Sequence, residues 1–147
     1  PERMRYLLFS VLVIFSIGVF AVPGAFADAT VTNAPGSATP GCEETNTCFI
    51  PSTVTISVGD TVTWENTDNA AHTATSGTTE DGPDGVWDSS LMMVGGSYSV
   101  TLDEAGTYPY HCMVHPWMQG TVIVVGEPSS EPIELAFNGI EELNIDS

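Results

Sequence analysis

Three side chains that bind soft metals recur at every third position of one short segment. Cys112, His115 and Met118 form a Cys-x-x-His-x-x-Met motif, which offers a thiolate, an imidazole and a thioether. Several metals accept a thiolate with an imidazole, but a thioether favours a metal that passes through the soft Cu(I) state, and zinc makes little use of it. The motif therefore predicts a copper site with one Cu per chain, and a fold that holds this segment in place.

A copper site of the His₂Cys type with a weak axial Met needs one more imidazole, and the chain has 3 histidines. In the predicted strand 107–112, a period of two places Cys112 on the same face as Tyr110 and His111 on the opposite face. This alternation excludes His111. His72, in an upstream loop, is therefore the predicted second imidazole, although without the distant motif it would be read as an ordinary polar residue.

Short alternating segments separated by turn residues predict the fold class. Apolar residues alternate with hydroxyl residues in several segments, and no convincing helical pattern is present. The pattern predicts an all-β, antiparallel sandwich or barrel. The expected strands cover residues 30–34, 53–58, 61–65, 97–102, 107–112 and 120–126, and the region 66–88 is expected to be loop.

Three features of these strands carry more specific expectations. Gly59 and Asp60 predict that the strands 53–58 and 61–65 form a hairpin or a tight corner. Pro109 lacks a backbone donor and predicts an edge or bulged position. The apolar composition of 120–126 predicts a strand buried on both faces, and Trp64 is expected in the core.

The cysteines divide into a pair and a single residue. Cys42 and Cys48 are close in a polar loop and are expected to form a disulfide in an oxidising compartment. The rival interpretation, that they bind metal, is weakened because no histidine lies near them in the sequence. Cys112 is left unpaired, and a bound metal would occupy its thiol.

The N-terminal stretch reads as a secretory signal peptide. Arg3 and Arg5 precede an apolar run over 6–22, and Ala25-Phe26-Ala27 supplies a small-residue cleavage site. The alternative is a membrane anchor, but the run is short for a bilayer span. The expected organisation is a signal peptide at 1–27, a copper-binding domain at 28–126 and an acidic linker and C-terminal tail at 127–147, with export to the periplasm or outer face of the cell envelope and no membrane span after cleavage.

The charge of the chain is strongly one-sided. It has 19 acidic and 2 basic residues, and both basic residues lie in the predicted leader. Such a surface repels nucleic acid and anionic headgroups, and it attracts basic proteins with salt-sensitive association rates. Solubility in a saline or acidic setting explains the charge equally well, so the charge alone does not identify a partner.

Several motifs in order resemble the cupredoxins, most closely the amicyanin and plastocyanin group of blue copper proteins. The resemblance covers roughly Phe49–Gly126 and rests on the segment 58–66, the His72 loop, Trp87-Asp88-Ser89 and the segment 106–120. It implies a Greek-key β-sandwich in which Cys112, His72 and His115 form a trigonal plane and Met118 is the axial ligand. Where the family commonly has Asn after the upstream histidine, this chain has Thr73, so the hydrogen bonds between the ligand loops are expected to differ.

The resemblance implies an exported carrier that shuttles single electrons between redox partners. An apolar patch around His115, with Trp117, Met113, Met92 and Met93, would suit transient docking, although ordinary loop packing also explains these residues. Two other classes stay open: a copper enzyme with an open axial position acting on nitric oxide or nitrite, and copper storage or delivery through several methionines.

Overall fold

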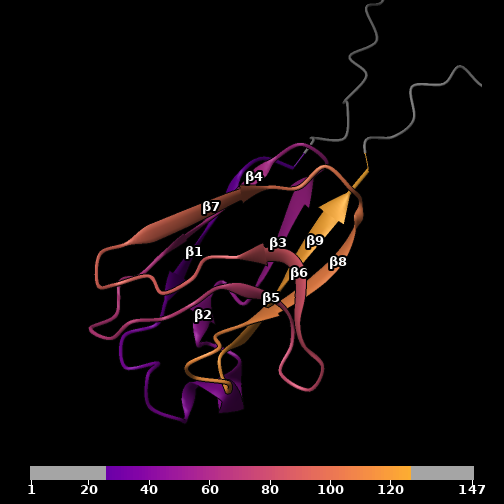
Figure 1. The fold of residues 1–147 in the computed structure, drawn as a ribbon. Helices are drawn as coiled ribbons and strands as arrows, with labels where there is room; N and C mark the ends of the chain where they lie inside the picture. Colours follow the sequence, from indigo (N-terminus) through magenta and orange to yellow (C-terminus); the bar gives the residue numbers. More distant parts are fainter. Residues whose placement is uncertain (1–25, 127–147) are drawn as a thin grey trace, which may run out of the picture.

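The protein forms a β-sandwich of two sheets (Figure 1), in a computed structural model that describes residues 26–126. One sheet has the strand order β2-β1-β4-β7 and the other has the order β3-β9-β8-β5-β6. The strands are β1 (Ala29–Asn33), β2 (Phe49–Ile50), β3 (Thr53–Ser57), β4 (Thr61–Glu65), β5 (Thr75–Thr78), β6 (Gly82–Asp88), β7 (Ser97–Thr101), β8 (Gly106–His111) and β9 (Gln119–Val125). The all-β prediction is confirmed. The tail at 127–147 and nearly all of the predicted signal peptide lie outside the described residues.

The core follows the predicted alternation and has an aromatic centre. Apolar residues at every second position of β3 and β9 are buried between the sheets. Trp64 of β4 is fully buried, and its ring centroid lies 5.2 Å from that of Tyr110 and 5.5 Å from that of Trp87. Such pairs contribute roughly 0.5–1.5 kcal/mol beyond the area they bury. The core therefore reaches up to the residues that precede Cys112 on β8.

Two strand pairs are parallel, which the antiparallel prediction did not include. β1 runs parallel to β4, and β3 runs parallel to β9. Both pairs join strands that are not neighbours in the sequence, so their direction leaves no local pattern. The turn at Gly59, whose φ is 87°, carries the chain from β3 in one sheet to β4 in the other. The corner therefore forms and the hairpin does not.

The hairpin of β5 and β6 was missed, because the region 66–88 was expected to be loop. The buried residues of β5 are hydroxyl residues and glycine: the Ser76 hydroxyl accepts a hydrogen bond from the Trp87 N–H at 2.9 Å and donates one to the Trp87 carbonyl at 3.0 Å. Gly77 has a φ of 112°, and a Cβ there would collide with the Gly82 carbonyl. A strand built from hydroxyls and glycine shows no apolar alternation, so the pattern gave no signal.

The expectations for two single strands had different outcomes. Pro109 lies in β8, an interior strand, but β5 pairs with β8 only at Tyr110 and His111, so Pro109 has no partner strand on that side and its position is locally an edge, as expected. The expectation that 120–126 is buried on both faces was wrong. In β9, Val122 and Val124 are buried whereas Ile123 and Val125 are only half-buried. Within residues 26–126 no third layer covers the outer face of this sheet, so β9 is fully buried on one face only.

β8 ends and β9 begins at one end of the sandwich, and the loop 112–118 that joins them is drawn in orange near the bottom of Figure 1. The indigo segment 34–48, which contains the 3₁₀ helix η1 (Cys42–Thr45), lies beside this loop. Among residues 26–126 no helix has the length and apolar character needed to cross a membrane. This end of the sandwich gathers the residues that the sequence singled out.

Candidate metal centre

Three donor atoms from two loops meet at this end. Cys112 Sγ lies 3.9 Å from His72 Nδ1 and 3.7 Å from His115 Nδ1, and the two nitrogens are 3.1 Å apart. The point equidistant from the three atoms lies about 2.1 Å from each, within the range of about 2.0 to 2.3 Å that nitrogen and sulfur donors keep from a first-row ion such as zinc. The geometry thus fits one metal ion, and a thiolate with two imidazoles suits copper.

The ligand loop is closed by its own backbone. The Cys112 N–H donates to the Met118 carbonyl at 3.0 Å, and the Met118 N–H donates to the His115 carbonyl at 2.9 Å. These bonds keep the first and last residues of the motif side by side. The Met118 side chain is fully buried.

His72 is held by hydrogen bonds to both its backbone and its side chain. Its backbone exchanges two hydrogen bonds with Met92, at 3.1 and 2.8 Å. Its Nε2 lies 2.7 Å from Asp68 Oδ2, and both side chains are almost completely buried. Because a carboxylate accepts and cannot donate, Nε2 carries the hydrogen and Nδ1 is left with its lone pair for a metal.

Asp68 was not anticipated from the sequence. An acid four residues before a histidine has a fixed geometry in a helix but not in a loop, so the spacing carried no signal. Burial by itself raises the pKa of Asp68, but hydrogen bonds from the Gly36 N–H, from His72 and from the Asn69 N–H outweigh it, and the pKa falls to about 2. Asp68 is therefore a buried anion behind one predicted ligand.

Thr73 ties the two ligand loops together. Its N–H donates to Cys112 Sγ at 3.3 Å, and its hydroxyl oxygen accepts a hydrogen bond from the Met113 N–H at 2.9 Å. The hydroxyl also pairs with that of Thr75 at 2.9 Å. The tie between the loops is thus present with Thr at this position, and one backbone donor points at the sulfur.

His115 is the more exposed of the two imidazoles. It is half-buried, whereas His72 is fully buried. Burial lowers the pKa of His115, the neighbouring His72 lowers it further, and Asp68 acts in the opposite direction. A lowered pKa favours the neutral imidazole, which is the form that binds a metal.

Cys42 and Cys48 form a disulfide with their Cα atoms 4.9 Å apart, and Cys112 is a free, buried thiol. The cysteines of the pair also lie close to Glu43. However, both sulfurs are joined to each other, which argues against the rival metal-binding interpretation of this pair.

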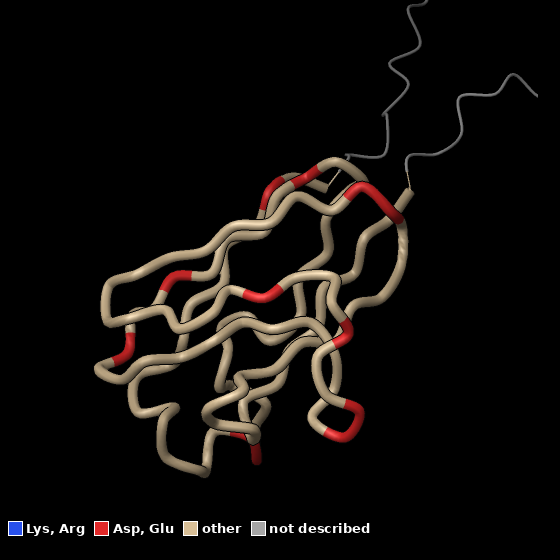
Figure 2. Tube along the Cα trace, viewed as in Figure 1, with Lys and Arg blue, Asp and Glu red and all other residues tan. Residues whose placement is uncertain are grey.

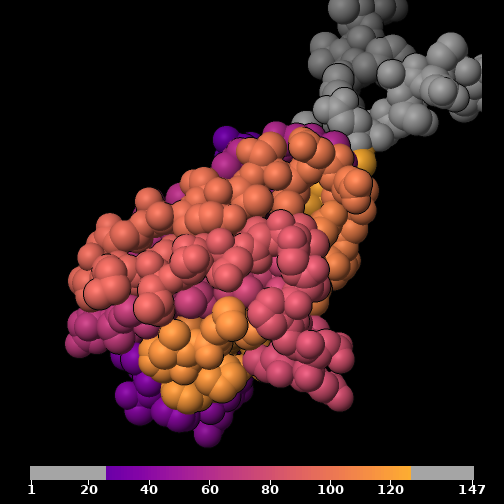
Figure 3. Space-filling model, in the orientation of Figure 1, coloured from indigo at the N-terminus to yellow at the C-terminus, as the bar shows by residue number. Residues whose placement is uncertain are grey.

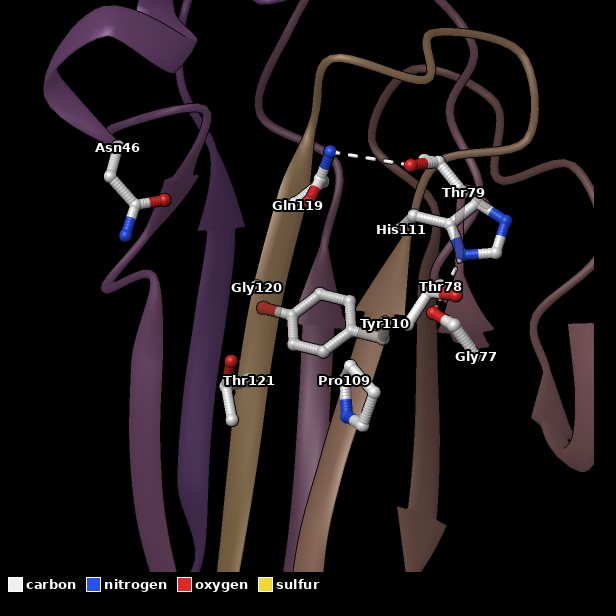
Figure 4. Close-up of a pocket in the computed structure, with 10 residues that line it drawn as sticks. All are labelled: Asn46, Gly77, Thr78, Thr79, Pro109, Tyr110, His111, Gln119, Gly120 and Thr121. Atoms are coloured by element: carbon white, nitrogen blue, oxygen red, sulfur yellow. Dashed lines mark hydrogen bonds between the residues drawn. The ribbon is translucent and has the colours of Figure 1, made fainter. Parts of the chain in front are cut away.

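A separate cavity lies on the outer face of the five-stranded sheet (Figure 4), with a volume of about 210 Å³. His111 lines it, and its Nδ1 donates to the Gly77 carbonyl at 2.8 Å. None of the four predicted ligands lines this cavity. His111 therefore lies on the other side of β8 from the donor cluster, as its place in the strand alternation predicts.

The fold and the donor set together define a class: a β-sandwich metalloprotein with a Cys/His₂ centre at one end. The sequence model for copper binding proteins of the plastocyanin/azurin family matches residues 37–125. The chain belongs to this family, and its sandwich is of the cupredoxin type.

Individual relatives agree with this assignment. Amicyanin of Paracoccus denitrificans is 40% identical over 75 residues, which cover 47% of this chain and 52% of the amicyanin. A plastocyanin of Scenedesmus fuscus is 39% identical over 84 residues, which cover 52% of this chain and 85% of the plastocyanin. The matched region thus spans only about half the length of the amicyanin.

Among solved structures, a purple cupredoxin from Nitrosopumilus maritimus aligns with a TM-score of 0.60 and 28% identity, covering 67% of this chain and all of that one. This similarity extends over most of the described residues. It supports the cupredoxin fold independently of the ligand motif.

Proposed function

We propose that the protein is an exported electron carrier with one copper ion per chain, which His72, Cys112, His115 and Met118 would hold. The observation that supports this most is the triangle of three donor atoms with edges of 3.1 to 3.9 Å. Copper bound there would supply one-electron chemistry through its Cu(I) and Cu(II) states.

The surrounding residues keep the donors in one arrangement. The closed backbone of the loop 112–118, the Thr73 tie and the bridge between His72 and Met92 all limit movement of the ligands. A site that does not rearrange suits electron transfer, because both oxidation states then share one geometry. The buried Cys112 thiol is also shielded from oxidation by solvent-borne reagents.

Exposed apolar residues on two loops that carry or support the ligands suit a docking partner. We call this set the apolar collar: Met113 and Val114 precede His115, and Leu91, Met93 and Val94 flank Met92, whose backbone pairs with His72. The ligand loop 112–118 belongs to the orange group near the bottom of Figure 3, beside the indigo N-terminal segment. Met92, expected in this patch, is instead buried. Trp117 is half-buried and bonded to Ser37.

The distribution of charge around the collar suits a basic partner. Both collar segments, 89–97 and 112–118, lack charged residues, while carboxylates are spread over other loops and no Lys or Arg occurs in the described range (Figure 2). We infer a redox protein with an apolar contact surface and a basic rim. Association should then slow as ionic strength rises, because salt screens the attraction.

Two features favour a location outside the cytoplasm. The disulfide of Cys42 and Cys48 suits an oxidising space, and the predicted leader at 1–27 would deliver the domain 28–126 to the periplasm or to the outer face of the cell envelope. Mass spectrometry of the exported protein tests this, because cleavage after Ala27 predicts an N-terminus at Asp28.

Addition of Cu(II) to the metal-free protein tests the ligand set. The expected result is an intense visible band from thiolate-to-copper charge transfer, complete at one equivalent and absent in Cys112→Ser. His111→Gln is the matched control, because His111 lies on the other side of β8, and it should keep the band. A colourless adduct in the unmodified protein would rule out the proposed centre.

The same sample separates the two other functional classes. A change of the band with azide, nitrite or nitric oxide would indicate an open axial position and favour an enzyme. More than one tightly bound copper per chain would favour storage through exposed thioethers such as Met93 and Met113. The carrier predicts no effect of these small molecules and a single copper.

A further inference from the structure

Asp68 connects a predicted ligand to a distant part of the chain. Its Oδ2 accepts the hydrogen bond from His72 Nε2 at 2.7 Å, and its Oδ1 accepts one from the Gly36 N–H at 2.8 Å. The Ser37 hydroxyl lies 3.4 Å from Oδ2. The carboxylate uses both oxygens at once, so the position of His72 depends on the turn at 36–37.

Asp68 is also fixed from its own loop. Its N–H donates to the Asn66 side-chain oxygen at 3.1 Å. The Asn66 amide group in turn donates to the carbonyls of Ala70 and Met92, at 2.8 and 2.9 Å. Because Met92 is paired with His72, the carboxylate and the imidazole are held within one network of buried hydrogen bonds.

The same turn contacts the loop of the other imidazole. Trp117 Nε1–H donates to the Ser37 carbonyl at 2.8 Å. The Trp117 ring centroid lies 5.3 Å from that of His115, and the two rings are tilted by 52°. Residues 36 and 37 therefore contact the supports of both imidazoles, which come from loops far apart in the sequence.

The segment that follows the turn is itself constrained. The Ala34 N–H donates to the Cys48 carbonyl at 2.9 Å, and the disulfide joins Cys42 to Cys48. The segment 34–48 is thus closed at its base by a backbone bond and internally by a covalent bond. A segment that is constrained in this way can hold its hydrogen-bond partners, Asp68 and Trp117, in fixed positions.

We propose that Asp68 and the turn at Gly36 and Ser37 are positioning residues of the metal centre. Asp68 orients His72 through Nε2, and Ser37 orients the loop of His115 through Trp117. The proposal rests on His72 and His115 being the imidazole ligands. It assigns to the segment 34–48 the role of holding Asp68 and Trp117 in place. The buried carboxylate of Asp68 behind an imidazole makes that ligand more basic and favours the more highly charged Cu(II).

Three variants separate the positioning of the ligands from the effects of changed charge or changed shape. Asp68→Asn keeps the shape but has a single acceptor oxygen, so it cannot accept from both His72 and Gly36. Trp117→Phe keeps an aromatic ring and removes the donor to Ser37. Asp103→Asn removes one charge at an exposed position in the β7–β8 turn and is the matched control.

The first measurement uses metal-free protein, in which the ring nitrogens of His72 are observed by NMR. The unmodified protein should show His72 with its hydrogen on Nε2. Asp68→Asn should populate the other tautomer or average the two, and Asp103→Asn should not change the signals. A His72 signal unchanged in Asp68→Asn would overturn the role of the carboxylate, whether or not the protein binds copper.

The second measurement uses Cu(II) affinity and the midpoint potential. Loss of such a partner typically weakens metal binding by about 10 to 100-fold. If Cu(I) binding is unchanged, each tenfold loss raises the potential by about 59 mV. Trp117→Phe should shift both quantities in the same direction by a smaller factor. Values for both variants within about twofold of Asp103→Asn would contradict the proposal, whereas absence of the visible band in the unmodified protein would contradict the copper function instead.

Discussion

The two imidazoles of the centre lie in contrasting surroundings. His72 is fully buried, its backbone is paired with Met92 and its Nε2 is bonded to Asp68. His115 is half-buried in a loop whose neighbours Met113 and Val114 are exposed. One side of the centre is therefore fixed by the interior, and the other side opens to the surface.

This difference shows how a single centre can be both rigid and accessible. The buried side sets the geometry, because hydrogen bonds hidden from water are not exchanged for bonds to solvent. The exposed side brings one ligand to the apolar collar, where a partner could approach closely. The predictions below test whether the two sides differ as their burial implies.

The largest expected difference is in rescue by an added ligand. His115→Gly and His72→Gly should each lose the visible band, because each removes a donor. Free imidazole should restore most of the band in His115→Gly, since the space it leaves is open to solvent, and should restore little in His72→Gly. Titration of the copper-loaded variants with imidazole measures this. Equal rescue would show that the two sides do not differ in access.

The two methionines of the ligand loop provide a second test, in the metal-free protein. Met118→Ala should lower the free energy of unfolding by about 2 to 5 kcal/mol, because Met118 is fully buried and the change leaves a cavity. Met113→Ala should change it by about 0.5 kcal/mol or less, because Met113 is 51% exposed. Urea denaturation gives both values. A similar loss in both variants would mean that the loop is not divided into a buried and an exposed part.

The smallest expected effect is the pH dependence of the buried side. The pKa of Asp68 is lowered from 3.8 to about 2 in the folded protein. Its ionised form therefore contributes stability that is fully present above about pH 4 and is lost as the pH falls through about 2. The stability difference between the metal-free protein and Asp68→Asn should shrink over this interval. Denaturation at several pH values measures it, and a constant difference would contradict the lowered pKa.

Much of the fold could be predicted because its strands bury alternate apolar residues. Trp64 and the faces of β3 and β8 followed from this periodicity. The β5–β6 hairpin could not be predicted in the same way, since its buried contacts are made by Ser76 and by Gly77 rather than by an apolar series. The two parallel strand pairs were not predicted for a different reason. The relative direction of strands that are distant in the sequence depends on the whole topology and not on a local pattern.

The residues of the candidate centre also fall into those that a local pattern predicts and those that only the structure reveals. Cys112, His115 and Met118 lie in one motif, and the alternation along β8 separated His111 from Cys112. Asp68 and Ser37 were found only in the structure, because their hydrogen bonds to Gly36 and Trp117 join segments far apart in the sequence. Thr73 was singled out from the sequence, but its bond to Cys112 was found only in the structure. Their roles depend on which loops lie together at one end of the sandwich, and the spacing of residues in the sequence does not predict that arrangement.

A redox titration of the copper-loaded protein, followed by its visible band, tests the central claim most directly. A carrier with a fixed centre should lose the band on uptake of one electron per chain and should regain it fully on reoxidation, over repeated cycles and without release of copper. Incomplete recovery, or copper release on reduction, would show that the site does not hold both oxidation states, and the electron-carrier account would then be wrong.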